Sequence, residues 1–279
     1  MRMPLAYLSA CIRGLIVLWL ALLIGGCITT VPITGRSQLN SQPDELMHRL
    51  GSALYSKKLS GSKVVSSGSQ NAMVQRIFQK VLAATEDYYR ELGKLAEFHT
   101  FQWSVVLIED SIPNARCYPN GNIMVFTGIL PFTKNEDGLA ALLGHEISHA
   151  LARHSAERVT EQDLAGGLSA LASSSFGPKI PNQTGNLSGE LLDNALRYGF
   201  ILPHSRLHEA EADHMGLILM AMAGFDPKEA PLLWQRMSVH PTRPEILASH
   251  PAPLTRMNQL NALVPTVEPI YKKAKLLGR

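Results

Sequence analysis

The sequence has few cysteines, few aromatic residues and little net charge. It contains three cysteines in 279 residues (Cys11, Cys27 and Cys117), 6% aromatic residues and a formal net charge of +3. The cysteines do not provide the framework of a disulfide-rich protein, and 46% hydrophobic residues indicate an apolar core rather than a disordered or collagen-like chain. Because the charge is nearly neutral and no lysine/arginine stripe is present, nothing indicates nucleic-acid binding.

Long apolar runs are also scarce. The most prominent, Gly14–Ile24, is too short for the ~20 residues of a membrane-spanning helix but suits a secretory signal. It leads into Leu23-Ile24-Gly25-Gly26-Cys27, which resembles a bacterial lipobox. On this interpretation residues 1–26 are a lipoprotein signal peptide, Cys27 is lipidated, and residues 27–43 form a polar tether. An uncleaved N-terminal anchor is the alternative, because a further apolar stretch precedes the run.

The residue after the lipobox cysteine predicts a location. It is Ile28 rather than aspartate, and by resemblance to lipoprotein sorting in bacteria with two membranes this favours the outer membrane, facing the periplasm. An inner-membrane anchor is the alternative within the cell envelope. With Cys27 acylated and Cys11 removed, Cys117 would be the only thiol, and we expect a buried structural cysteine rather than a nucleophile.

Hydrophobic periodicity predicts a helix-dominated α+β domain with a small sheet over residues 44–279. Residues Gly166–Gly189, rich in Gly, Ser, Pro and Asn, are expected to form a mobile insertion or lid. The predicted helices are Glu45–Leu59, Asn71–Leu92, one capped by Asn135 and running to Arg153, Ser205–Ala223, Lys228–Ser238 and Leu254–Leu263; the predicted strands are Trp103–Ile108 and Asn122–Phe126.

One of these helices carries the motif His145-Glu146-Ile147-Ser148-His149. Spacing i, i+4 places both imidazoles on one helix face, one turn apart, where they can bind a single metal ion. Imidazole nitrogens suit zinc, and Glu146 is placed to act as general base on a water. Apolar neighbours such as Leu142 and Leu143 indicate a buried motif, and buried His and Glu side chains need partners.

A catalytic zinc usually has three protein ligands, so one is missing from this motif. The helix about sixty residues later contains Glu209, Glu211 and Asp213. Glu209 and Asp213 share a helix face, whereas Glu211 points roughly opposite. Glu209 is therefore the favoured third ligand, with Asp213 behind it accepting a hydrogen bond from a ligand imidazole.

Together these segments resemble the gluzincin family of the CAAX prenyl endopeptidase, the HtpX heat-shock protease and the mitochondrial stress-activated inner-membrane protease. Its periplasmic lipoprotein members are the most similar, because they too have a short polar stretch, here Val31–Leu39, after the lipidated cysteine. The resemblance covers about half the chain and rests on Asn114–Cys117, Val125–Leu130, His145–His149, Ser205–Gly216, Ser249-His250-Pro251 and Arg256.

The resemblance implies a zincin-like metalloprotease domain with one Zn²⁺ per chain. Its ligands would be His145, His149 and Glu209, with Glu146 as base. For His250 the resemblance leaves two roles near the zinc, a plug or a transition-state donor, and a simple helix-capping turn is equally open. The four histidines without a role in this scheme are expected at the surface or behind the ligands: His154, His204, His208 and His214.

The predicted activity is zinc-dependent endopeptidase action on unfolded or misassembled envelope proteins. An extended peptide is expected to pair with an edge strand, for which Asn122–Phe126 is the candidate. The alternative is an outer-membrane protein assembly factor or holdase with minor or gated proteolysis. Predicted partners are therefore such polypeptides, the membrane through the lipid anchor, and outer-membrane assembly machinery.

Overall fold

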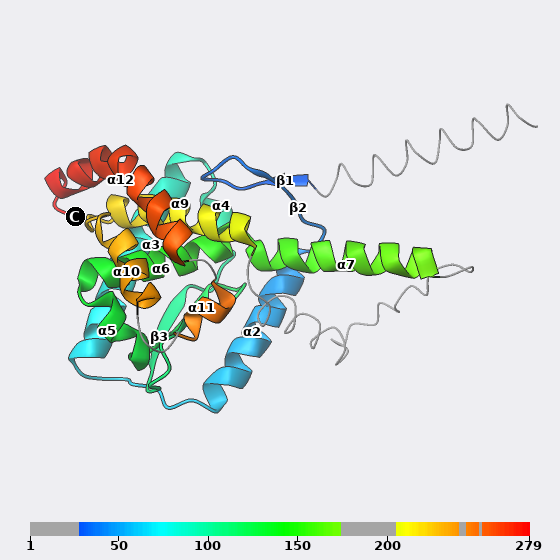
Figure 1. The fold of residues 1–279 in the computed structure, drawn as a ribbon, viewed down its shortest axis with the longest axis horizontal. Coiled ribbons are helices and arrows are strands. Elements are labelled where there is room, and N and C mark those ends of the chain that lie inside the picture. Colours follow the sequence, from blue (N-terminus) through cyan, green and yellow to red (C-terminus); the bar gives the residue numbers. More distant parts are fainter. Residues whose placement is uncertain (1–27, 174–204, 240–243, 251–252) are drawn as a thin grey trace, which may run out of the picture.

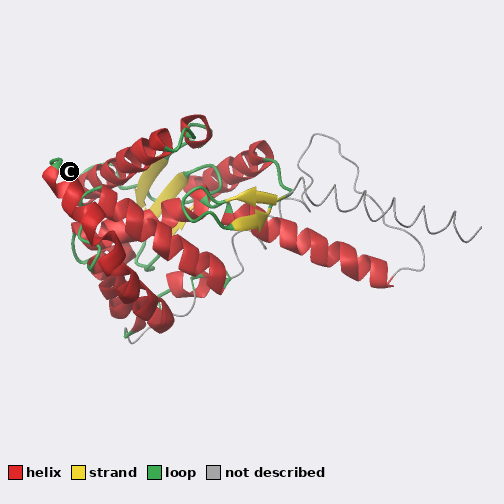
Figure 2. Ribbon diagram, turned by 90° about the horizontal axis from the view of Figure 1, so that it is seen from above, coloured by secondary structure: helices red, strands yellow, loops and turns green. Residues whose placement is uncertain are grey.

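The structure is a computed structural model that describes residues 28–173, 205–239, 244–250 and 253–279. Helices dominate it and surround a small sheet (Figures 1 and 2), which confirms the predicted α+β class. The helices are α2 (Asp44–Ser60), α3 (Ser69–Glu91), α4 (Leu95–Phe98), η1 (Thr127–Ile129, a 3₁₀ helix), α5 (Leu130–Thr133), α6 (Glu136–Leu151), α7 (His154–Ser173), α9 (Arg206–Met222), α10 (Glu229–Ser238), α11 (Ile246–Ser249) and α12 (Pro253–Leu276).

Two of the long helices begin at side-chain caps that the sequence provides. The Asn135 side chain accepts a hydrogen bond from the Gly138 N–H at the start of α6, and Ser205 accepts one from the His208 N–H at the start of α9. Each cap satisfies a backbone donor that has no partner within its helix. These caps fix the first turns of the two helices that carry the predicted metal ligands.

Helix α12 continues to Leu276, well beyond the predicted end at Leu263, although Pro265 and Pro269 lie inside it. A proline within a helix costs ~3 kcal/mol because one backbone hydrogen bond is lost and its ring crowds the preceding turn. Leu260 and Val267 are buried in the core on the same helix, which packs on α9 and α10. Burial of this face offsets the proline penalty, so the prediction of a short helix was wrong.

Helix α7 extends away from the rest of the molecule (Figure 1) and includes the first part of the predicted lid, Gly166–Gly189. Residues as far as Ser173 are helical, whereas the remainder of that segment lies outside the described residues. Arg153, with φ +53°, makes the turn between α6 and α7. The prediction that one helix runs through Arg153 is therefore corrected to two helices meeting at this turn.

The main sheet has the strand order β3-β5-β4, formed by β3 (Ser104–Ile108), β5 (Asn122–Phe126) and β4 (Ala115–Cys117). β5 pairs in parallel with β3 and antiparallel with β4, so it is the central strand and all five of its residues are buried. The expectation that Asn122–Phe126 is a peptide-binding edge was wrong, because the three-residue β4 was not recognised and covers that side.

The N-terminal hairpin consists of β1 (Ile28–Thr30) and β2 (Ser37–Leu39), which pair antiparallel. This segment was expected to be a polar tether. Instead Val31 is fully buried against the main core, and Ser41 bonds to Thr160 on α7. Among the described residues, no helix is both long and apolar enough to span a membrane.

Candidate metal centre

The centre forms where α6 and α9 cross at unusually short range. A Cβ atom added to Gly144 would lie 2.8 Å from the Gly216 carbonyl oxygen, and one added to Gly216 would lie 2.7 Å from the His145 nitrogen. Real Cβ atoms do not approach so closely, so both positions require glycine. This glycine contact allows a side chain from α9 to reach the histidines of α6.

Four buried side chains converge at this crossing. His145 Nε2 lies 3.0 Å from His149 Nε2 and 3.2 Å from His250 Nδ1. Glu209 on α9 places Oε1 2.9 Å from His250 Nδ1 and 3.5 Å from His149 Nε2. The ligand atoms of His145, His149, Glu209 and His250 all lie within 4.8 Å of one another, as a metal site requires.

These groups fit a metal ion chemically. Three imidazole nitrogens and a carboxylate form a donor set that zinc accepts. Each of the four side chains is at least nine-tenths buried, and such clustering of nitrogen and oxygen ligands in a core needs a cation or protons to stabilise it. His145, His149 and Glu209 would hold the ion, and His250 is within reach as a fourth ligand.

A second layer of charges supports the ligands. Asp213 Oδ1 lies 3.1 Å from His145 Nδ1, and the buried Arg256 guanidinium binds both Asp213 and Glu209, at 2.6 Å and 2.7 Å. Arg256 also stacks over the Trp234 ring, 3.3 Å from its centroid. A carboxylate behind a ligand imidazole fixes the ring orientation and favours coordination through the opposite nitrogen.

The charges of this layer also set the protonation of the carboxylates. Burial acts to raise the pKa of Glu209, but the charges of His250 and Arg256 outweigh it and lower the pKa to about 2. The pKa of Asp213 is likewise lowered to about 2, because Arg256 outweighs the effect of its burial. Both groups are therefore carboxylates at neutral pH, as ligation and support of a cation require.

Glu146 is oriented by the edge strand of the sheet. Its Oε2 accepts a hydrogen bond of 2.8 Å from the Cys117 backbone N–H, while its Oε1 has no hydrogen-bond partner among the described residues and faces His250 Nε2 at 3.6 Å. One carboxylate oxygen is thus anchored and the other is turned toward the cluster. That arrangement suits a general base.

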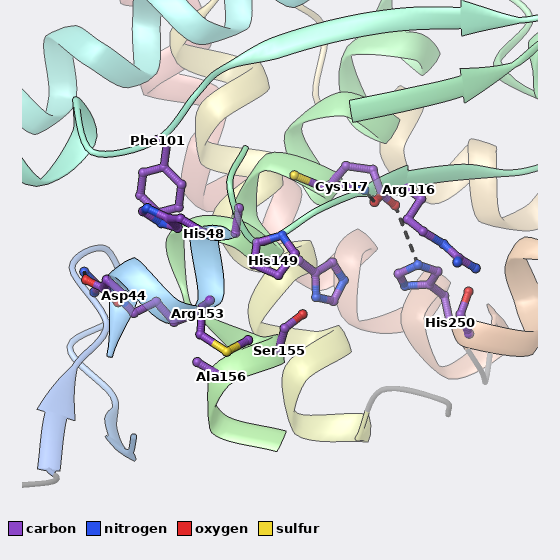
Figure 3. Close-up of a pocket in the computed structure, with 15 residues that line it drawn as sticks. Asp44, His48, Phe101, Arg116, Cys117, His149, Arg153, Ser155, Ala156 and His250 are labelled. Carbon is purple, nitrogen blue, oxygen red and sulfur yellow. Dashed lines mark hydrogen bonds and ion pairs between the residues drawn. The ribbon is translucent and has the colours of Figure 1, made fainter. Parts of the chain in front are cut away.

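A pocket of about 40 Å³ borders the cluster. Cys117, His149 and His250 line one part, and Phe101, His48 and the Arg153–Asp44 ion pair line the other (Figure 3). A volume near 40 Å³ accommodates water but no peptide segment.

Several residues of this site were not recognised from the sequence. Arg256 and Gly216 were noted only as parts of family motifs, and Gly144 was not singled out, although the α6–α9 contact depends on both glycines. Of the two positions expected for the remaining histidines, His154 takes the one behind a ligand, because it is buried and its Nδ1 lies 2.9 Å from His149 Nδ1. His208 is also buried and stacks on His154, whereas His204 lies outside the described residues. Each of the two buried histidines lies three positions before a glutamate, Glu157 or Glu211, and this spacing was the available signal in the sequence.

The fold and this site define a metalloendopeptidase that acts on polypeptides. The chain belongs to peptidase family M48, whose sequence model matches residues 69–264. It is similar to the mitochondrial metalloendopeptidase OMA1 of Schizosaccharomyces pombe, with 32% identity over 85% of this chain and 67% of the relative. It is also similar to mitochondrial OMA1 of Homo sapiens (29% identity; 84% of this chain, 45% of the relative) and to the Beta-barrel assembly-enhancing protease of Escherichia coli (31%; 65% and 39%).

These comparisons confirm the predicted gluzincin resemblance and overturn the predicted location. The relatives that match 84–92% of the chain are mitochondrial metalloendopeptidases rather than bacterial outer-membrane lipoproteins. The prediction of a lipid anchor in a bacterial envelope membrane was therefore wrong. It rested on the apolar run Gly14–Ile24, the small residues before Cys27 and the identity of Ile28, which are short patterns with little information, and residues 1–27 lie outside the described residues. The chain spans about half the length of its human relative.

Proposed function

We propose that this protein is a zinc-dependent endopeptidase that hydrolyses unfolded or misassembled polypeptides as a form of quality control. The observation that carries the proposal is the buried ligand set of His145, His149 and Glu209 beside an anchored Glu146. A bound zinc ion would supply polarisation of the scissile carbonyl and would acidify a water molecule. Glu146 accepts the proton of the attacking water and then delivers it to the leaving amine.

The position of β4 at the edge of the sheet supports binding of an extended peptide. The Asn114 carbonyl accepts a hydrogen bond from the Phe126 N–H, and the Tyr118 N–H donates to the Asn122 carbonyl. Along a strand of an antiparallel pair, successive residues point their backbone groups alternately toward and away from the partner strand. The backbone groups of Ala115 and Cys117 therefore point away from β5. The Cys117 N–H already orients Glu146, which places this edge directly beside the base. A substrate that pairs with β4 must present its main chain, and only unfolded segments do so.

Comparing folded and unfolded forms of one substrate tests this proposal. With zinc-loaded protein, we expect rapid cleavage of reduced, alkylated α-lactalbumin and little cleavage of native α-lactalbumin, because only the first offers an extended main chain. Appearance of new N-termini, measured by mass spectrometry, reports endoproteolysis. Glu146→Gln protein is the control for a contaminating protease. Equal cleavage of both forms would contradict selection of unfolded chains.

A second candidate is an assembly factor or holdase in which proteolysis is minor, favoured by the name of the Escherichia coli relative. The two functions differ in their dependence on Glu146. If the protein is a holdase, the wild-type and Glu146→Gln proteins would suppress aggregation of an unfolded client protein equally well. If it is a quality-control peptidase, the Glu146→Gln protein would no longer lower the amount of the client protein.

His250 is proposed to hold the resting site closed. Its Nδ1 lies within 3.2 Å of both His145 Nε2 and Glu209 Oε1, and its ring lines the small pocket. A fourth protein ligand would occupy the position that a catalytic water needs. His250 follows the short helix α11, whose Ile246 N–H bonds to the Pro113 carbonyl near β4, so displacement of this loop and substrate binding at β4 would be coupled.

Replacing His250 by alanine should therefore increase hydrolysis of the unfolded substrate severalfold, with zinc content still about one per chain. Initial rates and metal analysis on the same samples measure both quantities. His99→Ala, which removes an exposed histidine that pairs with Glu86, is the matched control. A lower kcat would show instead that His250 stabilises the transition state, and an unchanged rate would reduce it to a turn residue.

A further inference from the structure

The N-terminal hairpin inserts one arginine into a buried polar cluster behind the metal centre. The turn between its strands is closed by the bonds Val31 N–H to Arg36 carbonyl and Gly35 N–H to Val31 carbonyl, each 2.9 Å. Gly35 adopts φ +70°, a conformation that favours glycine. With Val31 fully buried as the anchor of the turn, the Arg36 side chain is directed between α7 and α9.

Arg36 neutralises one buried carboxylate from each of these helices. Its two terminal nitrogens donate to the two oxygens of Glu157 on α7, at 2.7 Å each, and its Nε donates to Glu211 Oε2 on α9, also at 2.7 Å. The Thr34 hydroxyl donates to the other oxygen of Glu211. Glu157 and Glu211 are only 5% and 6% exposed, so without the guanidinium two nearly desolvated anions would face each other.

From Glu211 the contacts continue to a proposed metal ligand. His154 Nε2 lies 3.0 Å from Glu211 Oε2, and His154 Nδ1 lies 2.9 Å from His149 Nδ1. His149 turns its Nε2 toward the metal cluster, and a ligating nitrogen carries no proton. The remaining proton of neutral His149 is then on Nδ1, where it is donated to His154 Nδ1. His154 in turn donates from Nε2 to Glu211. With this one arrangement of protons, each hydrogen bond from His149 through His154 to Glu211 has one donor and one acceptor.

The two histidines of the motif therefore have different support. His145 contacts a carboxylate directly, Asp213, which Arg256 neutralises. His149 is linked to its carboxylate, Glu211, through the imidazole of His154, and Arg36 neutralises Glu211 as Arg256 neutralises Asp213. Glu211 and Asp213 both project from α9, whereas Arg36 comes from a hairpin that precedes the residues matched by the family model. A segment distant in sequence thus completes the surroundings of a ligand.

We infer that Arg36 is a positioning residue for the metal: through Glu211 and His154 it fixes the ring orientation and tautomer of His149, so that metal affinity depends on the seating of the N-terminal hairpin. The inference rests on the proposed metal centre. Groups behind a metal ligand typically change affinity by roughly 10–100-fold when removed. A change of this size is expected for Arg36 although its guanidinium contacts no ligand.

The test uses the full chain and zinc alone, with Arg36→Gln and the matched control Arg236→Gln. Arg236 is also a partly buried arginine bound to a glutamate, Glu229, and to backbone carbonyls, but it contacts no member of the metal cluster. Competition with a chromophoric chelator should show zinc binding weakened roughly 10–100-fold in Arg36→Gln and unchanged in Arg236→Gln. The visible spectrum of the cobalt-substituted protein, which reports ligand geometry, should change only in Arg36→Gln.

Two further variants separate positioning from simple loss of stability. His154→Phe leaves Arg36 and Glu157 paired but removes the acceptor for His149, and it should weaken zinc binding as Arg36→Gln does. Arg36→Lys keeps the charge without the fork geometry and should restore affinity only in part. Wild-type affinity and an unaltered cobalt spectrum in Arg36→Gln and His154→Phe would overturn the inference. Failure of the wild-type chain to bind zinc would instead overturn the proposed metal centre.

Discussion

Replacing Glu209 by alanine is expected to remove bound zinc and peptidase activity together. Glu209 is the only carboxylate of the four-residue cluster, and its Oε1 lies within 3.5 Å of His149 Nε2 and His250 Nδ1. Without it the ion would keep only imidazole ligands and would lose the negative charge that offsets its own. Metal content after dialysis and hydrolysis of an unfolded substrate measure the two losses. His145→Ala and His149→Ala should behave in the same way.

The control must account for Arg256, which is buried against Glu209 and Asp213. Removing one carboxylate leaves a buried cation with one partner fewer, and this can lower stability independently of metal. Glu209→Gln keeps the volume and a hydrogen-bond acceptor for Arg256, so it should fold and still bind zinc poorly. Full zinc occupancy in Glu209→Ala would refute the ligand assignment. Glu211, which in the structure bonds to Arg36 and His154, would then be reconsidered as the third ligand.

The substitution Glu146→Gln is expected to retain zinc and abolish most hydrolysis. The glutamine carbonyl oxygen can still accept the Cys117 N–H, the bond that positions the carboxylate in the wild-type protein. The amide cannot accept a proton from water, so the step that the base performs is lost. General base catalysis contributes roughly 10²–10⁴-fold, and kcat/KM should fall by about that factor.

Glu136→Gln is a suitable comparison, because Glu136 lies on the same helix, is exposed and pairs only with Arg76 among the described contacts. It should leave zinc content and rate unchanged. Circular dichroism of both variants should match the wild type. Casein hydrolysis by Glu146→Gln at nearly the wild-type rate would eliminate Glu146 as the base.

Periodicity and capping made most of the helices predictable. The apolar spacing of α3 and the caps Asn135 and Ser205 are local signals, readable within one segment. The extent of α12 was not predictable, because Pro265 and Pro269 are locally unfavourable and only burial against α9 and α10 offsets them. β4 escaped recognition for a related reason: three residues are too few for a pattern, and the strand exists because β5 pairs with it.

The same distinction applies to the site. The i, i+4 spacing of His145 and His149 and the shared face of Glu209 and Asp213 follow from helix geometry alone. Helix geometry also shows that Glu211 points away from them, but not that it meets His154 and Arg36 there. His250 lies 41 residues after Glu209, and no local rule states which of the roles left open by the sequence (plug, transition-state donor or helix-capping turn) it takes.

The sequence by itself determined the class of chemistry, because two imidazoles one helical turn apart and an acidic helix further along can be read from fixed helical periodicity. It also determined the helix-dominated fold, through apolar spacing and capping residues. Only the tertiary structure decided that His250 completes the cluster, that β4 rather than β5 is the edge strand on that side of the sheet, and that Arg36 stands behind His149. These contacts join residues up to 175 positions apart. Whether such residues meet depends on how α6 and α9 cross at Gly144 and Gly216 and on where α7 and the N-terminal hairpin lie beside them. Packing of that kind is a property of the whole core rather than of any segment.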